Sequence, residues 1–338
     1  MSRYVVLVAL AAVLAACSSS SPGSPAATPP SHVSRFASGG CHSATPAPSV
    51  TNRLAQVTVS GATRTYLLTT PAPHRQAAPL VLDFHGYGEG DYTESRTTQL
   101  GALGQRDGFI TAFPEGSGTP VAWDVSTQAG NRDLGFVGAL LDHLEATQCI
   151  DMSRVYATGL SQGGFMTSTL ACAMSARFAA FAPVDGVRMP MPCHPARPVP
   201  ILTFHGTADP ILKFNGGIDL RVIEHDLQAQ PGPLPKLPPT HVNGAGIPAT
   251  VRAWAAKDGC NPTPTDTRVS PHVIHRVYQC PTGAALEFYI VVGGGHTWPG
   301  SALDAQLVRF VGPTTRELNA SQTIWAFFQR FRLTRRAV

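Results

Sequence analysis

A serine that could act as a nucleophile lies between an expected strand and an expected helix. Ser161 is the central residue of a G-x-S-x-G motif at residues 159–163. The apolar run 154–158 predicts a buried strand before the motif, and residues 165–172 predict the start of a helix after it. A serine at the apex of such a turn is typical of a nucleophile elbow. The alternative is an ordinary glycine-rich turn, since so short a motif also arises by chance in a chain with 32 glycines.

Two further residues could activate this serine. A serine hydroxyl is a poor nucleophile at neutral pH, so it needs a general base, and the base needs an orienting carboxylate. Asp209 follows the strand-like run 200–205, and His296 follows the run 286–292 on a loop with three consecutive glycines. The order serine, acid, histidine is the one expected along a mostly parallel sheet that carries an elbow. We therefore expect Ser161, Asp209 and His296 to act together as nucleophile, acid and base.

Other ionisable residues compete for these roles. Asp185 follows the run 178–182 and is an alternative acid, although a triad acid usually lies further along the sheet. His85 and His205 stand in His-Gly turns at strand ends, where a packed or hydrogen-bonded structural role is the commoner one. We therefore assign neither histidine as the base and keep Asp209 ahead of Asp185 as the acid.

The sequence gives no sign of a metal site or of a cofactor. His272 and His275 have an H-x-x-H spacing, but no acidic residue or cysteine cluster accompanies them in the sequence. Zinc sites normally combine histidine with cysteine or carboxylate ligands at short spacings. We expect no metal at these histidines and no cofactor elsewhere.

Acyl transfer also needs N–H groups that stabilise the oxyanion of the tetrahedral intermediate. The elbow geometry provides one such donor, the backbone N–H of Gln162. The second should come from the turn at residues 85–88, after the expected strand 80–84, and we choose the N–H of Tyr87. The aromatic rings of Tyr87 and Trp298 are expected to line the substrate pocket. For Trp298, packing in the core under the histidine loop is the alternative.

The elements that must position these residues alternate along the chain from residue 80 onward. Apolar residues recur at helical spacing in residues 132–147 and 320–331, between strand-like runs. This alternation predicts an α/β fold with a mostly parallel central sheet and helices on both faces. Residues 54–59 and 64–69 predict an antiparallel hairpin at the sheet edge. The sequence contains no repeat and no second core, so we expect one catalytic domain.

The first forty residues differ in composition from that domain. The apolar run 4–16 is too short to span a bilayer and fits a signal-peptide core. Its end, Leu14-Ala-Ala-Cys17, resembles the lipobox of bacterial lipoprotein signals. The resemblance implies cleavage before Cys17 and a lipid on its thiol, with a plain secretory signal as the alternative. Residues 18–40, rich in serine, proline and alanine, predict a disordered tether, and residues 41–338 the catalytic domain.

Six cysteines follow Cys17, and an even number in an exported chain favours disulfide bonds. The alternative is that they are small buried apolar residues. Six cysteines allow fifteen pairings. We expect the last two pairs to join neighbouring elements on the sheet and the first to fasten the start of the domain. The expected bonds are Cys41–Cys149, Cys172–Cys193 and Cys260–Cys280.

The charge distribution gives little support for nucleic-acid binding. The net charge is +4, and only 14% of residues are charged. The arginines at residues 330–336 make the C-terminus basic, but no aromatic or glycine-rich reading segment accompanies them. We expect an ester substrate, no nucleic acid, and contact with a membrane only through a lipid anchor at the outer face of the cell membrane.

Several motifs together resemble one family of enzymes. They are His85-Gly86, the elbow at 159–164, the run 205–209, and Gly-Gly-Gly-His-Thr-Trp-Pro-Gly at 293–300, the most specific of the four. From about residue 41 to residue 331 the chain resembles the polyhydroxybutyrate depolymerase and feruloyl esterase group of α/β-hydrolases, in its LpqC-type lipoprotein form. The resemblance implies an α/β-hydrolase fold, with Ser161 as nucleophile, Asp209 as acid and His296 as base.

The resemblance implies a serine esterase, but members of the group hydrolyse different esters. A proline-rich insertion at about residues 227–247 departs from the family pattern and could cover the site or form a surface loop. Two other functions stay open. One is a serine peptidase of the same fold, which uses the same three residues. The other is a catalytically silent envelope protein that binds a ligand.

Overall fold

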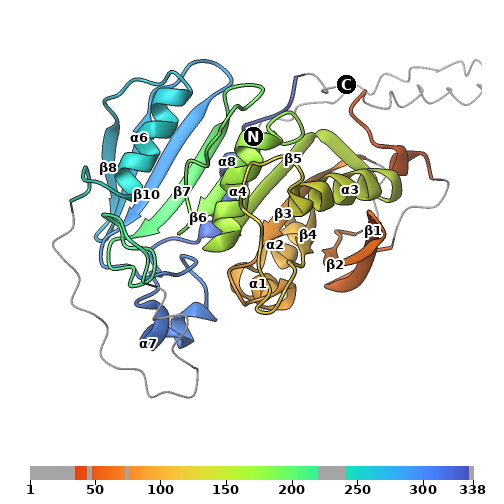
Figure 1. Ribbon diagram of the computed structural model, residues 1–338, viewed down its shortest axis with the longest axis horizontal. Coiled ribbons are helices and arrows are strands. Elements are labelled where there is room, and N and C mark those ends of the chain that lie inside the picture. The colour runs from red at the N-terminus through yellow and green to blue at the C-terminus, as the bar shows by residue number, and fades with distance from the viewer. Residues whose placement is uncertain (1–34, 44–47, 73–75, 220–240, 335–338) are drawn as a thin grey trace, which may run out of the picture. The chain divides into compact units, whose positions relative to one another are not determined.

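A ten-stranded sheet lies at the centre of the computed structural model (Figure 1). The structure describes residues 35–43, 48–72, 76–219 and 241–334. The signal segment, Cys17, most of the expected tether and most of the proline-rich insertion lie outside these ranges. Within them, no helix is both long enough and apolar enough to cross a bilayer.

The strands follow the order β1-β2-β4-β3-β5-β6-β7-β10-β9-β8 across the sheet. Their bounds are β1 (Arg53–Val59), β2 (Ala62–Thr69), β3 (Ala78–Phe84), β4 (Ile110–Pro114), β5 (Ile150–Leu160), β6 (Ala180–Val184), β7 (Pro200–Gly206), β8 (Thr265–Ser270), β9 (Val273–Tyr278) and β10 (Ala285–Val291). The helices are η1 (Gly39–His42), α1 (Asp91–Thr98), α2 (Leu100–Asp107), α3 (Arg132–Thr147), α4 (Gln162–Ala173), α6 (Ile247–Lys257), η2 (Asp304–Gln306), α7 (Val308–Val311) and α8 (Ala320–Phe328).

The six central strands, from β4 to β10, are parallel to one another. Each edge of the sheet ends in an antiparallel pair, β1–β2 at one edge and β9–β8 at the other. The predicted hairpin at residues 54–69 is therefore confirmed, as is the α/β class. Because parallel strands share their direction, the loops after β5, β6, β7 and β10 all leave the same end of the sheet.

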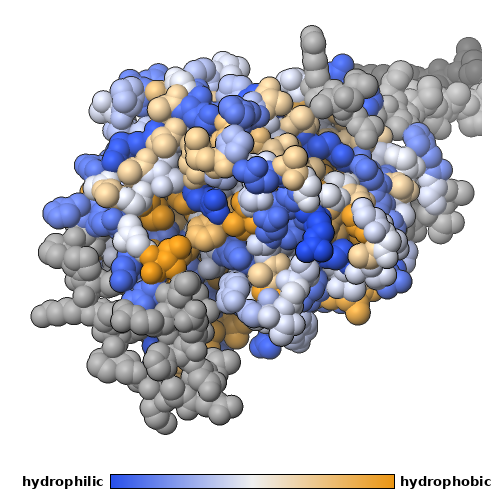
Figure 2. All heavy atoms as spheres, in the orientation of Figure 1, coloured by the Kyte–Doolittle hydropathy of each residue, from blue (hydrophilic) through white to orange (hydrophobic). Residues whose placement is uncertain are grey.

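Helices cover both faces of this sheet, as the alternating pattern predicts. One buried cluster joins the apolar sides of α3, α4 and α6 to one face, with Leu140, Leu170 and Trp254 at its centre. A second cluster joins α2 and α8 to the other face through Leu103 and Trp325. On the surface shown in Figure 2, hydrophilic side chains surround small groups of hydrophobic ones. The central strands β3 to β7 are thus almost entirely buried, whereas β1 and β8 at the two edges of the sheet are mostly exposed.

Two parts of the fold differ from the sequence-based expectation. Residues 35–40 were assigned to the tether, but Ala37 pairs with Asp151, and the Ser38 hydroxyl donates to the carbonyl of Gln148 at 2.7 Å. The ordered domain therefore begins before Cys41, because a short polar segment can add itself to the sheet through backbone and hydroxyl bonds. The sequence also gave no prediction of β8, whose residues 265–270 are mostly polar and exposed.

The three expected disulfide bonds are all present, as Cys41–Cys149, Cys172–Cys193 and Cys260–Cys280. The first ties η1 to the chain just before β5. The other two link residues only 21 and 20 positions apart. Three such bonds fit a protein that folds in an oxidising compartment.

Removal of the Cys41–Cys149 bond should destabilise the protein more than removal of the Cys172–Cys193 bond. The first closes a loop of 108 residues and the second a loop of 21. Loop-closure entropy then gives about 5 kcal/mol for the first bond and about 3 kcal/mol for the second. Urea unfolding of the paired variants Cys41→Ser/Cys149→Ser and Cys172→Ser/Cys193→Ser measures the two losses. Equal losses, or a larger loss for the shorter loop, would contradict the expectation.

Candidate active site

Ser161 occupies a strained turn between β5 and α4. Its φ is +57° and its ψ is −117°, a backbone conformation that non-glycine residues rarely adopt. The Ser161 N–H donates to the carbonyl of Val184 at 3.0 Å, which anchors the turn to the end of β6. A Cβ on Gly163 would collide with the carbonyl of Phe84 in β3, so this position requires glycine. The motif is therefore a nucleophile elbow by geometry, and Ser161 is half-buried at its apex.

Asp209 and His296 form a hydrogen-bonded pair at the same end of the sheet. The His296 Nδ1 lies 2.8 Å from the Asp209 Oδ2, across 87 residues of sequence. Asp209 follows β7 and is fully buried, and His296, 6% exposed, follows β10. The other carboxylate oxygen of Asp209, Oδ1, accepts the N–H groups of Ile211 and Leu212 at 2.8 Å. The loop after β7 therefore holds the Asp209 carboxylate in place beside the imidazole.

The loop that carries His296 packs tightly on the end of β7. A Cβ on Gly206 would collide with the carbonyls of Gly294 and Gly295. The His296 N–H donates to the carbonyl of Val311 at 2.5 Å, which closes the loop on its far side. Within the glycine run itself, a Cβ on Gly295 would collide with the carbonyl of Val311, and the positive φ of Gly293, +76°, also favours glycine.

Burial and neighbouring charges shift the pKa values of this pair in opposite directions. For His296, burial lowers the pKa, but the Asp209 carboxylate outweighs it, and with Asp185 and Glu89 it raises the pKa to about 9. For Asp209, burial raises the pKa, but His296 and His205 outweigh it and hold the pKa well below its ordinary value. The pair is therefore arranged to stabilise a carboxylate beside an imidazolium.

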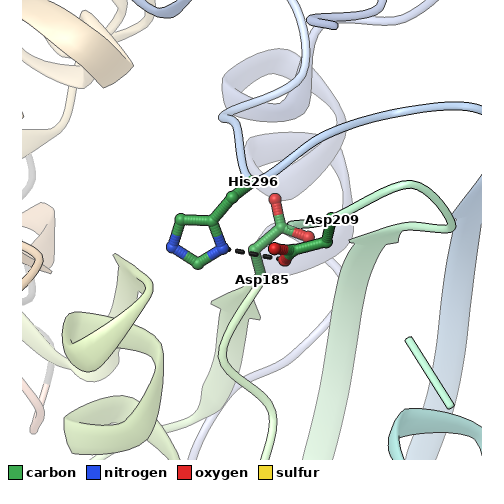
Figure 3. Close-up of side chains that lie close together, drawn as sticks. All are labelled: Asp185, Asp209 and His296. Carbon is green, nitrogen blue, oxygen red and sulfur yellow. Dashed lines mark hydrogen bonds and ion pairs between the residues drawn. The ribbon is translucent and has the colours of Figure 1, made fainter. Parts of the chain in front are cut away.

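Asp185, the alternative acid, lies beside the pair but does not take the position of Asp209. Figure 3 shows both carboxylates on one side of the imidazole, with its other ring nitrogen directed away from them. The Asp185 Oδ2 accepts the N–H of Thr297 at 2.8 Å, and its Oδ1 accepts the N–H of Gly206 at 3.0 Å. Its partners are thus backbone groups of the two loops that carry Asp209 and His296.

The Ser161 hydroxyl and the His296 ring make no hydrogen bond among the described residues. The two residues nevertheless share neighbours. Ser161 contacts Gly186, the residue after Asp185, and lies near Gly86, whose N–H donates to the Glu89 carboxylate. Asp185 and Glu89 also both act on the charge of His296. Catalytic hydrogen bonds are often long before a substrate binds.

The two expected oxyanion donors lie at the start of α4 and in the loop after β3. Gln162 is the first residue of α4, where a backbone N–H has no partner within the helix. Its side-chain Oε1 accepts the N–H of Trp123 at 3.0 Å, which holds the helix start in place. Tyr87 follows β3, and its N–H has no acceptor among the described residues. Both amides are therefore available as donors, and the Tyr87 side chain is 43% exposed.

Trp298 is a core residue, contrary to the expectation that it lines the pocket. Its side chain is 1% exposed and belongs to the cluster under α8. Its indole N–H donates to the Ser321 hydroxyl at 3.0 Å, and its backbone N–H to the Asp304 carboxylate at 2.6 Å. The ring therefore anchors the histidine loop to the helix beneath it and does not face the site.

Three of the other histidines have hydrogen-bond partners elsewhere in the fold. The His85 Nε2 accepts the N–H of Gly116 at 2.9 Å, and burial lowers the pKa of this residue. His272 and His275, which lack acidic neighbours in sequence, pair in space with Glu317 at 2.6 Å and Glu287 at 2.9 Å. The two pairs use different glutamates, so the H-x-x-H spacing forms no shared ligand set among the described residues.

Asp185, Asp209 and His296 also lie close enough together to be weighed as metal ligands, with one atom of each within 4.8 Å of the others. Their carboxylate oxygens already have protein partners. Asp209 accepts two backbone N–H groups and the imidazole, and Asp185 accepts two further N–H groups. The carboxylates of this set are thus satisfied by hydrogen bonds within the protein.

Buried carboxyl groups around the site were missed by the sequence analysis. Asp83 and Glu94 are both fully buried, and burial raises the pKa of Asp83 to about 7 and that of Glu94 well above its ordinary value. The polar run at residues 89–98 has no apolar pattern that could have placed Glu94 inside.

Substitution of Asp209 by Asn should lower the pKa of His296. The Asp209 carboxylate is the largest influence that raises this pKa, so its loss leaves burial to favour the neutral imidazole. The pKa should fall from about 9 toward or below 6.5, the ordinary value for histidine. A titration of the imidazole ¹⁵N signals measures it, with Asp258→Asn, a buried acid bonded to Val199, as the matched control. An unchanged pKa in Asp209→Asn would contradict the pairing.

The sequence of this protein is similar to the sequences of known esterases. "Putative esterase NocK" from Nocardia uniformis subsp. tsuyamanensis is 31% identical over 343 residues, which cover 94% of this chain and 94% of that protein. "Feruloyl esterase B" from Piromyces equi is 30% identical over 235 residues, 65% of this chain. The match covers 40% of the length of that second protein.

A family model and a solved structure agree on the fold. The model described as the prolyl oligopeptidase family matches residues 102–191, a stretch that contains the elbow. The acetyl xylan esterase from Aspergillus awamori superposes with a TM-score of 0.52 at 18% identity, over 76% of this chain and 98% of that one. At this identity the likeness shows a shared fold only. Because the match to NocK spans nearly the whole of both chains, this protein belongs to the esterase family of α/β-hydrolases that also includes feruloyl esterases.

Proposed function

We propose that this protein is an exported serine esterase that hydrolyses carboxylic esters through Ser161, His296 and Asp209. The observation that carries the proposal is the 2.8 Å bond between His296 and Asp209, at the strand ends that also present Ser161 in a strained elbow. A buried acid–imidazole pair beside a serine of this kind is the arrangement that serine hydrolases use. The esterase relatives support ester bonds as the target.

In the first step, the imidazole Nε2 of His296 takes the hydroxyl proton as the Ser161 oxygen attacks the ester carbonyl. The Nδ1–H of the same ring stays bonded to Asp209, so the ring keeps one tautomer and the new imidazolium faces a carboxylate. The raised pKa of His296 fits this role, because it reflects stabilisation of the charged ring. The imidazolium then gives its proton to the leaving alcohol.

In the second step, water attacks the acyl-enzyme in the same way. His296 takes a proton from the water, the tetrahedral intermediate forms again, and Ser161 leaves with that proton. We assign the N–H groups of Tyr87 and Gln162 to the oxyanion in both steps. Since neither amide has an acceptor in the described part of the chain, they can meet the developing negative charge without reorganisation.

The relatives include enzymes named for feruloyl and acetylxylan esters. We propose aromatic or short hydroxyacyl esters, of the feruloyl or hydroxybutyrate kind, as substrates. The exposed ring of Tyr87 is available at the rim of the site to pack against such groups.

A serine peptidase is the second candidate, and the match to the prolyl oligopeptidase model favours it to a degree. That match covers only residues 102–191, the elbow region that esterases and peptidases of this fold share. The match to NocK covers 94% of the chain, including the acid and the histidine. Ester hydrolysis is therefore the function supported best.

We also propose that residues 1–17 direct export and that Cys17 carries a lipid anchor, with residues 18–34 as the tether. The short apolar run before Cys17 and the three disulfide bonds of the domain both support export. The anchor would hold the enzyme at the outer face of the cell membrane.

Substitution of Ser161 by Ala should abolish ester hydrolysis. Loss of the nucleophile typically lowers kcat by about 10⁶ in serine hydrolases. Hydrolysis of nitrophenyl acetate, methyl ferulate and hydroxybutyrate oligomers is measured beside labelling by a fluorophosphonate probe. The wild type should be labelled and active, Ser161→Ala neither, and Ser117→Ala, which changes an exposed serine, should match the wild type. Labelling that persists in Ser161→Ala, or cleavage of peptide amides without esters, would overturn the assignment.

Substitution of Cys17 by Ala should release the protein from membranes. Without the thiol there is no site for the lipid, and a single short apolar segment does not span a bilayer. Detergent-phase partitioning of cells that express each form measures the effect. Equal partitioning of the wild type and Cys17→Ala would contradict lipidation and favour a plain secretory signal.

A further inference from the structure

Behind the Asp209–His296 pair lies a second carboxylate and imidazole, Asp185 and His205. Asp185 is 1% exposed and follows β6, and His205 is fully buried in β7. The Asp185 Oδ1 lies 3.4 Å from the His205 Nδ1. The Nε2 of the same ring lies 3.2 Å from the Asp209 Oδ2. Asp185, His205, Asp209 and His296 therefore form a continuous buried chain of alternating carboxylates and imidazoles.

One side chain in this chain joins the backbones of both catalytic loops. Asp185 accepts the N–H of Gly206, three residues before Asp209, and the N–H of Thr297, directly after His296. Its own N–H donates to the carbonyl of Phe204 at 3.0 Å. Each oxygen of Asp185 thus fixes the loop of a different catalytic residue.

The two ring nitrogens of His205 have different surroundings. Its Nε2 lies 2.7 Å from the carbonyl of Leu212, which can only accept, so that nitrogen carries a hydrogen. Its Nδ1 lies 3.4 Å from the Asp185 Oδ1 but makes no hydrogen bond among the described residues, so the two groups attract only as opposite charges, when Nδ1 also carries a proton. The Asp185 carboxylate therefore favours a protonated His205 ring in a space closed to water.

The charged groups around Asp185 are the three other members of the chain. Burial raises the pKa of Asp185, His205 and His296 lower it, Asp209 raises it, and the net result is a pKa raised to about 6. Burial lowers the pKa of His205, but the carboxylates of Asp185 and Asp209 outweigh it and raise the pKa overall. The raised pKa of His205 agrees with a charged ring between the two carboxylates.

We propose that Asp185 and His205 form a positioning pair, which holds the loops of Asp209 and His296 in register and supports the Asp209 carboxylate from behind. The proposal rests on the function proposed above. Neither residue touches the reacting atoms. Asp185 acts through Gly206 and Thr297, and His205 acts through its contact with Asp209.

Asp185→Asn separates this role from a purely structural one. Asparagine has nearly the same shape, and it tolerates the positive φ of +42° at this position well. Its one side-chain oxygen can accept only one of the two backbone N–H groups, and its NH₂ group cannot replace the second acceptor. The variant should therefore fold, with one catalytic loop released and without the negative charge that faces His205.

The expected result is a fall in kcat for ester hydrolysis of roughly 10- to 100-fold, the range expected from the loss of a hydrogen bond to a charged group, with KM changed less than about 2-fold. His205→Gln, which keeps a donor toward Leu212 but carries no charge between Asp185 and Asp209, should lower kcat similarly. The double variant should be little worse than either single variant, because the two residues act as one unit.

Proton NMR at low field gives a readout that does not depend on activity. In the wild type, separate signals are expected for the His296 Nδ1–H and the His205 Nδ1–H. Asp185→Asn should lose the His205 signal and keep that of His296. Asp258→Asn is the matched control, because it removes another buried acid bonded to a backbone N–H and should retain both signals and the wild-type kcat.

Three outcomes would overturn the proposal. They are wild-type kcat in Asp185→Asn, strictly additive losses in the double variant, and a His205 signal that survives the substitution. Failure of the proposed function would look different, because the wild type itself would then hydrolyse no ester while the NMR comparison would still report on the pair.

Discussion

The bond between Asp209 and His296 is the interaction on which the site depends. It joins two loops that are 87 residues apart in sequence, and it is buried from water. Burial alone would favour the neutral form of both groups, and each group opposes that effect on the pKa of the other. The parallel centre of the sheet makes this pairing possible, since β7 and β10 are neighbours whose ends point the same way.

Backbone crowding explains why the site needs glycine at fixed points. The elbow presses against the carbonyl of Phe84 at Gly163, and the histidine loop presses against the end of β7 at Gly206. Side chains at either position would push apart the strands that hold the site. The same closeness lets Asp185 reach two loops with one carboxylate, and it leaves Trp298 facing the core beneath.

Much of this arrangement could be predicted from the sequence, because it depends on short motifs and on the local spacing of apolar residues. The elbow, the strands before Asp209 and His296, helix α3 and the three disulfide bonds followed from motifs, periodicity and cysteine positions. The rest could not, for physical reasons. The sequence near His296 does not indicate which way the ring of Trp298 points. The partners of Asp185 are backbone N–H groups, which any residue type can provide, so no side chain in the sequence identifies them. The glutamate that pairs with His272 lies 45 positions away.

The link between Cys41 and Cys149 has a mechanical consequence. Cys149 directly precedes β5, the strand that leads into the elbow, and β5 lies between β3 and β6 within the sheet. A pull on the N-terminal segment can peel away only the few residues before Cys41, after which the load passes through a covalent bond. The force then acts on β5, a strand inside the sheet. It does not act first on the edge hairpin β1–β2, which would otherwise separate from the sheet before the other strands.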